Sequence, residues 1–164
     1  MSTSPYWNYT EFDPIRVQIQ VERIDARVLE RHLREQTREM RDPQAQRNRA
    51  YIIIDARDAT RPPPDVRKMQ AEWMEENRDL IARTCLGMSF VMPHRIVRGA
   101  LTAIFWVSRP PVPYRVHANL SEAIDHAVGV CDELGVDVPE DARRGDASRR
   151  VDLAFRRTQL ERVV

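Results

Sequence analysis

Hydrophobic and polar residues alternate with a period of two near the start of the chain. Between Ile15 and Ile24, aliphatic side chains stand at positions 15, 17, 19 and 21, and Arg, Gln or Glu stands at positions 16, 18, 20 and 22. This period is typical of a β-strand with one buried face. The mostly apolar run at 50–56 favours a central strand that is covered on both faces. Further strands are predicted at 86–92 and 114–118, with an aromatic-rich edge strand at 6–13.

Between these strands the apolar residues follow the spacing of amphipathic helices. One helix begins after residue 25, a second after residue 65, a third spans His94–Val107 and a fourth spans Leu120–Leu134. Strands that alternate with helices predict a mostly parallel sheet with right-handed crossovers, and therefore an α/β fold. The expected helix-capping residues are Asp25, Asp65, Asn119 or Ser121, and Gly135.

The chain divides into three parts by composition. Residues 1–135 carry the strand and helix pattern of one α/β domain, and 136–150 form a polar linker. Residues 151–164 regain a weak amphipathic pattern in which Phe155 and Leu160 are the apolar anchors. A piece this short does not fold alone. It must dock on its own domain, pair with a copy of itself or bind a partner.

Composition restricts the class of protein more than it identifies one. The chain has 164 residues, 42% hydrophobic and 31% charged, with a net charge of +1. We therefore expect one globular domain, with no nucleic-acid partner and no membrane partner. The longest apolar stretch is far shorter than a membrane span, and no signal peptide is recognised. Two cysteines outside any metal-binding or redox motif are expected to be buried, which fits a cytoplasmic location.

At the level of the fold, the stretch from Ile15 to Leu134 resembles STAS domains, the fold of anti-sigma-factor antagonists and their SpoIIAA-like relatives. The segments that carry the resemblance are Tyr51–Asp55, Gly87–Val91, Arg98–Trp106 and the helix start at Ser121–Ala123. The resemblance implies a four- to five-stranded mixed sheet with helices packed mainly on one face. It also implies a bacterial regulatory role in which the domain binds another protein.

In STAS domains that are phosphorylated, a Ser or Thr sits in the loop after the central strand. Thr60 is the only hydroxyl residue in the corresponding loop, so it is the phosphorylation candidate that the resemblance implies. Three consecutive prolines follow it, and the usual short Asp-Ser-Ser-Gly-like signature is missing. The alternative is a solvent-exposed turn residue without a regulatory role.

The sequence contains no convincing active site, and we expect no catalytic residues, no metal and no cofactor. The four histidines lack the spacing of a helical zinc site, and His32 falls on the charged face of its helix. Asp55 lies at a strand end, where α/β enzymes place carboxylates. Its neighbour Arg57 favours an ion pair instead.

Residues that could contact a partner cluster near the third helix. Trp106 directly follows Phe105, so both cannot face the same core. Trp106 is therefore either an exposed protein-contact residue beside a proline-rich loop or packs beneath that loop. Arg95 and Arg98 put positive charge on the first turn of this helix, where they could bind an anionic ligand or a phosphorylated partner. The alternative for these arginines is a solvated helix face.

Three functions are consistent with these observations. The first is a non-catalytic STAS-like interaction module in bacterial regulation or assembly, with an unidentified protein partner and possible homo-oligomerisation. The second is a module that binds a small apolar or anionic ligand, and it predicts a cavity lined by Met69, Trp73, Met88 or Phe90. The third is an enzyme that uses Asp55 with His94 or His117, and it requires those side chains within hydrogen-bond reach.

Overall fold

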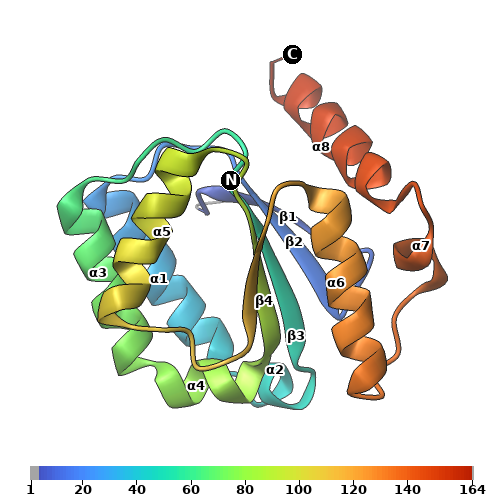
Figure 1. Cartoon of the computed structure of the whole chain (residues 1–164), viewed down its shortest axis with the longest axis horizontal. Helices are drawn as coiled ribbons and strands as arrows, with labels where there is room; N and C mark the ends of the chain where they lie inside the picture. The colour runs from blue at the N-terminus through green and yellow to red at the C-terminus, as the bar shows by residue number, and fades with distance from the viewer. Residues whose placement is uncertain (1–3, 164) are drawn as a thin grey trace.

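A computed structural model describes residues 4–163, except for the side chains of Ile96 and Val97. Five strands form one sheet in the order β1-β2-β3-β4-β5, with helices on both faces (Figure 1). The strands are β1 (Tyr6–Tyr9), β2 (Ile15–Gln20), β3 (Ala50–Asp55), β4 (Cys85–Val91) and β5 (Tyr114–His117). The helices are α1 (Ala26–Met40), α2 (Pro43–Arg47), α3 (Pro64–Glu76), α4 (Arg78–Thr84), α5 (Arg95–Val107), α6 (Leu120–Glu133), α7 (Glu140–Arg143) and α8 (Ala147–Val163).

The strand order determines which helices share a face of the sheet. β1 is antiparallel to β2, and β2 to β5 are parallel and adjacent in chain order. Right-handed crossovers between consecutive parallel strands place all the connecting helices on one face. Accordingly α1, α3, α4 and α5 form one layer, whereas α6 packs on the opposite face (Figure 1). The predicted α/β fold with a mixed, mostly parallel sheet is confirmed.

The face that α6 covers is a closed apolar core. The odd-numbered residues of β2 point into it, as the alternation predicted, and all are almost completely buried. Asn119 caps α6 by accepting a hydrogen bond from the Glu122 amide, and Gly135 ends it with a φ of +68°. The main members of this core are Ile15, Val17, Ile19, Ile53, Ile124, Ala127 and Val151.

The opposite face of the sheet is polar at one side and apolar at the other. Two of the even-numbered residues of β2, Gln18 and Gln20, point toward the helical layer and are only half-buried. On the neighbouring strands the same face presents Ile54 and Phe90. The helical layer therefore covers a surface that changes from amide to hydrocarbon across the sheet.

The termini of several elements differ from the sequence prediction. Asp65 lies in the first turn of α3 rather than at its cap, because Pro64 occupies the first helical position, which a fixed φ suits. The segment predicted as a linker, 136–150, contains α7 and the start of α8. Ala142 and Ala147 are buried there, and Arg143 pairs with Asp132 of α6.

An ion triad ties α8 to the end of the central strand. Asp55 has no exposed surface, and its carboxylate accepts hydrogen bonds from the backbone and the guanidinium of Arg57. The other side of that guanidinium donates to Asp152 of α8 at 2.7 Å. Asp55 and Asp152 together raise the pKa of Arg57 above its ordinary value. Asp55 is thus engaged in a structural ion pair.

We predict that Arg57→Met lowers the free energy of unfolding by about 3–5 kcal/mol, since it leaves the buried Asp55 carboxylate without its cation. Asp152→Asn removes only the half-exposed partner and is expected to cost about 1 kcal/mol. Urea denaturation of both variants checks the ranking. Equal losses would contradict the assignment of Asp55 as the dominant partner.

A close contact between β3 and β4 requires a glycine. A Cβ placed on Gly87 would lie 2.7 Å from the Tyr51 ring and 3.2 Å from the Pro113 carbonyl oxygen. Tyr51 is itself fully buried, so its ring has little room to move. Only a residue without a side chain fits this position.

We predict that Gly87→Ala destabilises the fold by about 1–3 kcal/mol through overpacking. Gly129→Ala is the matched control, because nothing lies within 4 Å of a Cβ at that position in α6. The control should be stabilised by roughly 0.5–1 kcal/mol. Thermal unfolding of the two variants distinguishes these effects, and a neutral Gly87→Ala would refute the contact.

Candidate functional site

A cavity of about 170 Å³ lies between the sheet and the layer of α1, α3, α4 and α5. This volume is comparable to that of an engineered apolar cavity that accepts benzene. Most of its wall is hydrocarbon, which the strands β3 and β4 and the helices α1, α3, α4 and α5 contribute. The apolar lining includes Leu29, Leu33, Ile54, Val66, Trp73, Met74, Ile81, Met88, Phe90, Leu101, Ile104 and Phe105.

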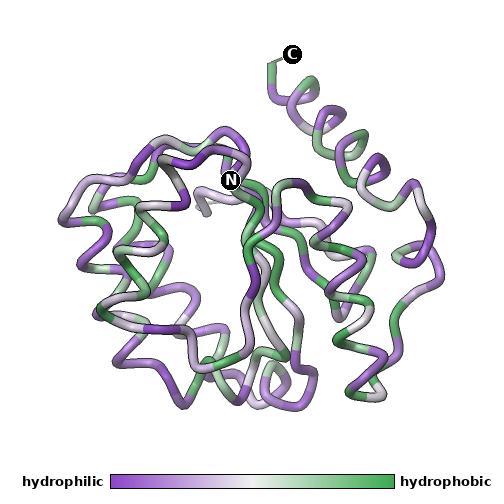
Figure 2. The backbone as a smooth tube through the Cα atoms, in the orientation of Figure 1, coloured by the Kyte–Doolittle hydropathy of each residue, from purple (hydrophilic) through white to green (hydrophobic). Residues whose placement is uncertain are grey.

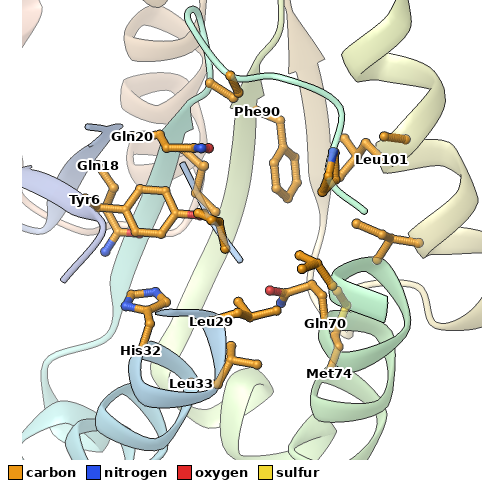
Figure 3. A pocket seen from close by; sticks show the side chains of 18 of the residues that line it. Tyr6, Gln18, Gln20, Leu29, His32, Leu33, Gln70, Met74, Phe90 and Leu101 are labelled. Atoms are coloured by element: carbon orange, nitrogen blue, oxygen red, sulfur yellow. The ribbon is translucent and has the colours of Figure 1, made fainter. Parts of the chain in front are cut away.

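One side of the cavity is polar. Figure 3 shows Tyr6, Gln18, Gln20 and His32 grouped along this side, across the cavity from Leu101. Within the described part of the chain, no hydrogen bond engages the Tyr6 hydroxyl, the Gln18 amide or the His32 ring. These groups are therefore able to donate and accept hydrogen bonds from a molecule in the cavity.

Burial keeps the polar side uncharged at neutral pH. It lowers the pKa of His32 to about 4 and raises the pKa of Tyr6 to about 12. The two rings pack against each other with centroids 5.0 Å apart. The prediction that His32 lies on a charged, solvated face is wrong, because β1 brings Tyr6 over that face of α1.

The lining residues that are exposed mark the mouth of the cavity. They are Arg23, which follows β2, and Thr60 and Arg61, which follow β3. The mouth thus lies beyond the carboxyl ends of parallel strands, the usual ligand position in open α/β sheets. Both arginines are free of ion pairs within residues 4–163, and no described lining residue is acidic. The mouth is therefore positively charged.

The sequence anticipated the apolar lining better than the polar side. Trp73, Met88 and Phe90 line the cavity, whereas Met69 packs in the cluster formed by Leu29, Leu33 and Val66. The alternation along β2 predicts only that its glutamines lie opposite the buried face of the strand. Their regular alternation, next to an aromatic segment, reveals a polar face of the strand. The pattern alone does not show whether that face is exposed to solvent or lines a cavity.

The residues predicted to contact a partner do not form one site. Trp106 is 86% exposed and lines a shallow groove together with Arg98, so it does not pack beneath the proline loop. Arg95 is exposed on the first turn of α5. The other two, Phe155 and Leu160, lie on α8 beyond the opposite face of the sheet (Figure 1).

The two α8 residues have different environments. Phe155 is half-buried, with its ring 5.3 Å from that of Trp7 in β1, whereas Leu160 is 70% exposed. In Figure 2 hydrophilic and hydrophobic residues alternate along α8, whose end extends away from the sheet. The first turns of α8 thus dock on the domain, as one of the three alternatives for this segment proposed.

A buried polar chain lies on the closed face. The Tyr51 hydroxyl is 2.8 Å from Ser89 Oγ, which is 3.2 Å from His117 Nε2. Burial and the neighbouring His126 keep the pKa of His117 below its ordinary value. A Ser–His contact suits nucleophilic catalysis only when the hydroxyl is accessible, and Ser89 has no exposed surface. The structure does not bring Asp55 to a histidine, because Arg57 engages it.

No family model, curated protein or solved structure matches the chain. The STAS resemblance and the role in bacterial regulation remain predictions. Among residues 4–163, no group of three or more His, Cys, Asp or Glu side chains could hold a metal ion. Within the same residues, the helices are too short or too polar to cross a membrane.

The low pKa of His32 predicts a pH-dependent stability. The unfolded ring binds a proton near its ordinary pKa of 6.5, whereas the folded ring binds one only near 4. Between these values the unfolded state holds more protons, so stability falls as the pH falls. For His32→Phe, we predict that the loss of stability between pH 7 and pH 4.5 is smaller by about 2–3 kcal/mol.

Urea denaturation of wild type and His32→Phe at both pH values isolates this contribution, since the other titrating groups are common to both proteins. An identical pH dependence in the two proteins would show that the ring is not desolvated.

Proposed function

We propose that this domain is a non-catalytic binding module for a small amphipathic molecule that has an apolar body and an anionic end. The observation that carries the proposal is the partly enclosed cavity, in which the Tyr6 hydroxyl, the Gln18 amide and the His32 ring make no hydrogen bond within residues 4–163. Burying an amide or imidazole without a hydrogen bond is unfavourable by about 1–3 kcal/mol. A bound molecule that supplies those bonds would recover this free energy.

The charges at the mouth support an anionic end for the ligand. Arg23 and Arg61 stand at the opening without carboxylate partners among the described residues, and guanidinium groups bind carboxylates with good geometry. The apolar body would then contact the hydrocarbon wall of the cavity between Phe90 and Leu101. A small aromatic or branched carboxylate satisfies both requirements within a volume of about 170 Å³.

A protein-interaction role, the first prediction from the sequence, is compatible with this proposal. A binding module can respond to its ligand and contact a partner through another surface. Trp106 on the outside of α5 is the observation that favours such a surface.

We predict that 3-phenylpropanoate binds with a dissociation constant on the order of 0.1–1 mM, as expected for a ligand of about ten non-hydrogen atoms. Ala100→Phe should weaken binding more than tenfold, because Ala100 is a buried lining residue and the added ring occupies the cavity. Ala103→Phe is the matched control, since Ala103 is exposed on the same helix. Isothermal titration calorimetry measures all three.

The anionic end is tested with 3-phenylpropan-1-ol, which keeps the apolar body and lacks the charge. Replacing Arg23 and Arg61 by Gln should weaken carboxylate binding severalfold and leave the alcohol unaffected. The proposal fails if wild type binds neither compound, or if Ala100→Phe binds the carboxylate as well as wild type does.

A further inference from the structure

The strand β5 leaves one edge of the sheet open. It pairs with β4 on one side, and no described strand pairs with its other side. The Pro113 and His117 carbonyls accept hydrogen bonds from the Met88 and Met92 amides of β4, at 2.9 and 3.0 Å. Because backbone groups in a parallel strand alternate in direction, those of Tyr114 and Val116 point to the open edge.

The same two residues present apolar side chains beside that edge. Tyr114 is 40% exposed and Val116 is 38% exposed, and Trp106 of α5 is 86% exposed next to them. The Tyr114 ring packs on Phe105 with centroids 4.7 Å apart, which fixes its position against α5. The three side chains border a shallow groove that runs between α5 and β5. The groove is lined by Arg98, Leu101, Thr102, Phe105, Trp106, Arg109, Tyr114 and Val116.

The groove is positively charged. Arg98 and Arg109 line it, and none of its described lining residues is acidic. Arg98 donates one hydrogen bond to the Met92 carbonyl through Nε, which leaves its terminal nitrogens for a ligand. The Arg109 side chain has no ion pair within the described residues. Carboxylates are the side-chain groups that complement such a groove.

We propose that the groove between α5 and β5 binds an extended segment of another protein whose groove-facing side chains, at every second position, include both acidic and apolar residues. The segment would add to the sheet as a sixth strand beside β5. Its backbone would pair with the free groups of Tyr114 and Val116, and its apolar side chains would contact Trp106 and those two residues. Backbone pairing supplies affinity in this mode of recognition, and the groove supplies specificity. Pairing of this kind requires an extended partner, because a helix has no free backbone groups to offer.

The charges favour such a partner over a second copy of this chain. In a symmetric dimer that joins two β5 edges, each copy would bring its own Arg98 and Arg109 to the shared groove. Like charges brought together across an interface oppose association. An acidic segment instead neutralises both arginines.

The probe is a capped hexapeptide of the sequence Glu-Ser-Val-Ser-Glu-Ser, in which every second side chain faces the groove, so that glutamate and valine both reach it. Isothermal titration calorimetry is the readout. Wild type should bind it, and a lysine–valine hexapeptide of the same pattern should bind at least tenfold more weakly. Two further peptides carry N-methyl groups either on the odd-numbered residues or on the even-numbered residues. One of these two should lose binding at least tenfold, since only alternate amides face β5.

Protein variants locate the site. Trp106→Glu should weaken binding at least tenfold, whereas Val107→Glu introduces the same charge at a 71% exposed neighbour outside the groove and should change it less than twofold. Val116→Pro removes an amide at the open edge, and Val116→Thr keeps it. Only the proline variant should lose binding. Circular dichroism confirms that each variant is folded.

Three results would overturn the proposal. The first is equal binding of the glutamate–valine and lysine–valine peptides. The second is tight binding of both N-methylated peptides. The third is a wild-type dimer in sedimentation equilibrium that Trp106→Glu converts to a monomer, since a second copy would then occupy the edge. These experiments use no cavity ligand, so a cavity that binds nothing leaves the test intact.

Discussion

The cavity exists because an apolar helical layer cannot close over amide groups without leaving them unsatisfied. β2 turns Ile15, Val17 and Ile19 toward α6, where hydrocarbon meets hydrocarbon and the core is filled. The opposite side of the same strand carries Gln18 and Gln20 and faces α1 and α3. Sealing them against Leu29 and Leu33 would bury polar groups without partners. The layer instead stands away from the sheet at this point and leaves the cavity.

The order of the strands places this cavity where a ligand can reach it. Consecutive right-handed crossovers put α1, α3, α4 and α5 on the face that bears the glutamines, and the strand ends place Arg23 and Arg61 at the opening. The helix α5 then separates two surfaces. Leu101 and Phe105 line both the cavity and the groove beside β5. A ligand that shifts α5 would therefore alter the groove, which provides a physical route from small-molecule binding to partner binding.

Local patterns were sufficient to predict the strands, the cap at Asn119 and the end of α6 at Gly135, since each depends on residues close in sequence. The pairing of Asp55 with Arg57 was also predictable, because the two are neighbours in the chain. The link from Arg57 to Asp152 was not, since 95 positions of the chain separate them. The polar side of the cavity was missed for the same reason: alternation on β2 reveals a polar face, and only the packing of β1 and α1 shows that it is enclosed. His32 was misread because its ring is covered by Tyr6 from a distant strand.

The central claim is that the polar side of β2 faces a cavity that accepts a small molecule. Methyl NMR on protein labelled at Leu, Val, Ile and Met, titrated with 3-phenylpropanoate, tests it most directly. The structure predicts shifts at Leu29, Met74, Met88 and Leu101, and none at Ile15, Val17 or Ile124 on the closed face. Absence of shifts at saturating ligand, or shifts centred on the closed face, would contradict it.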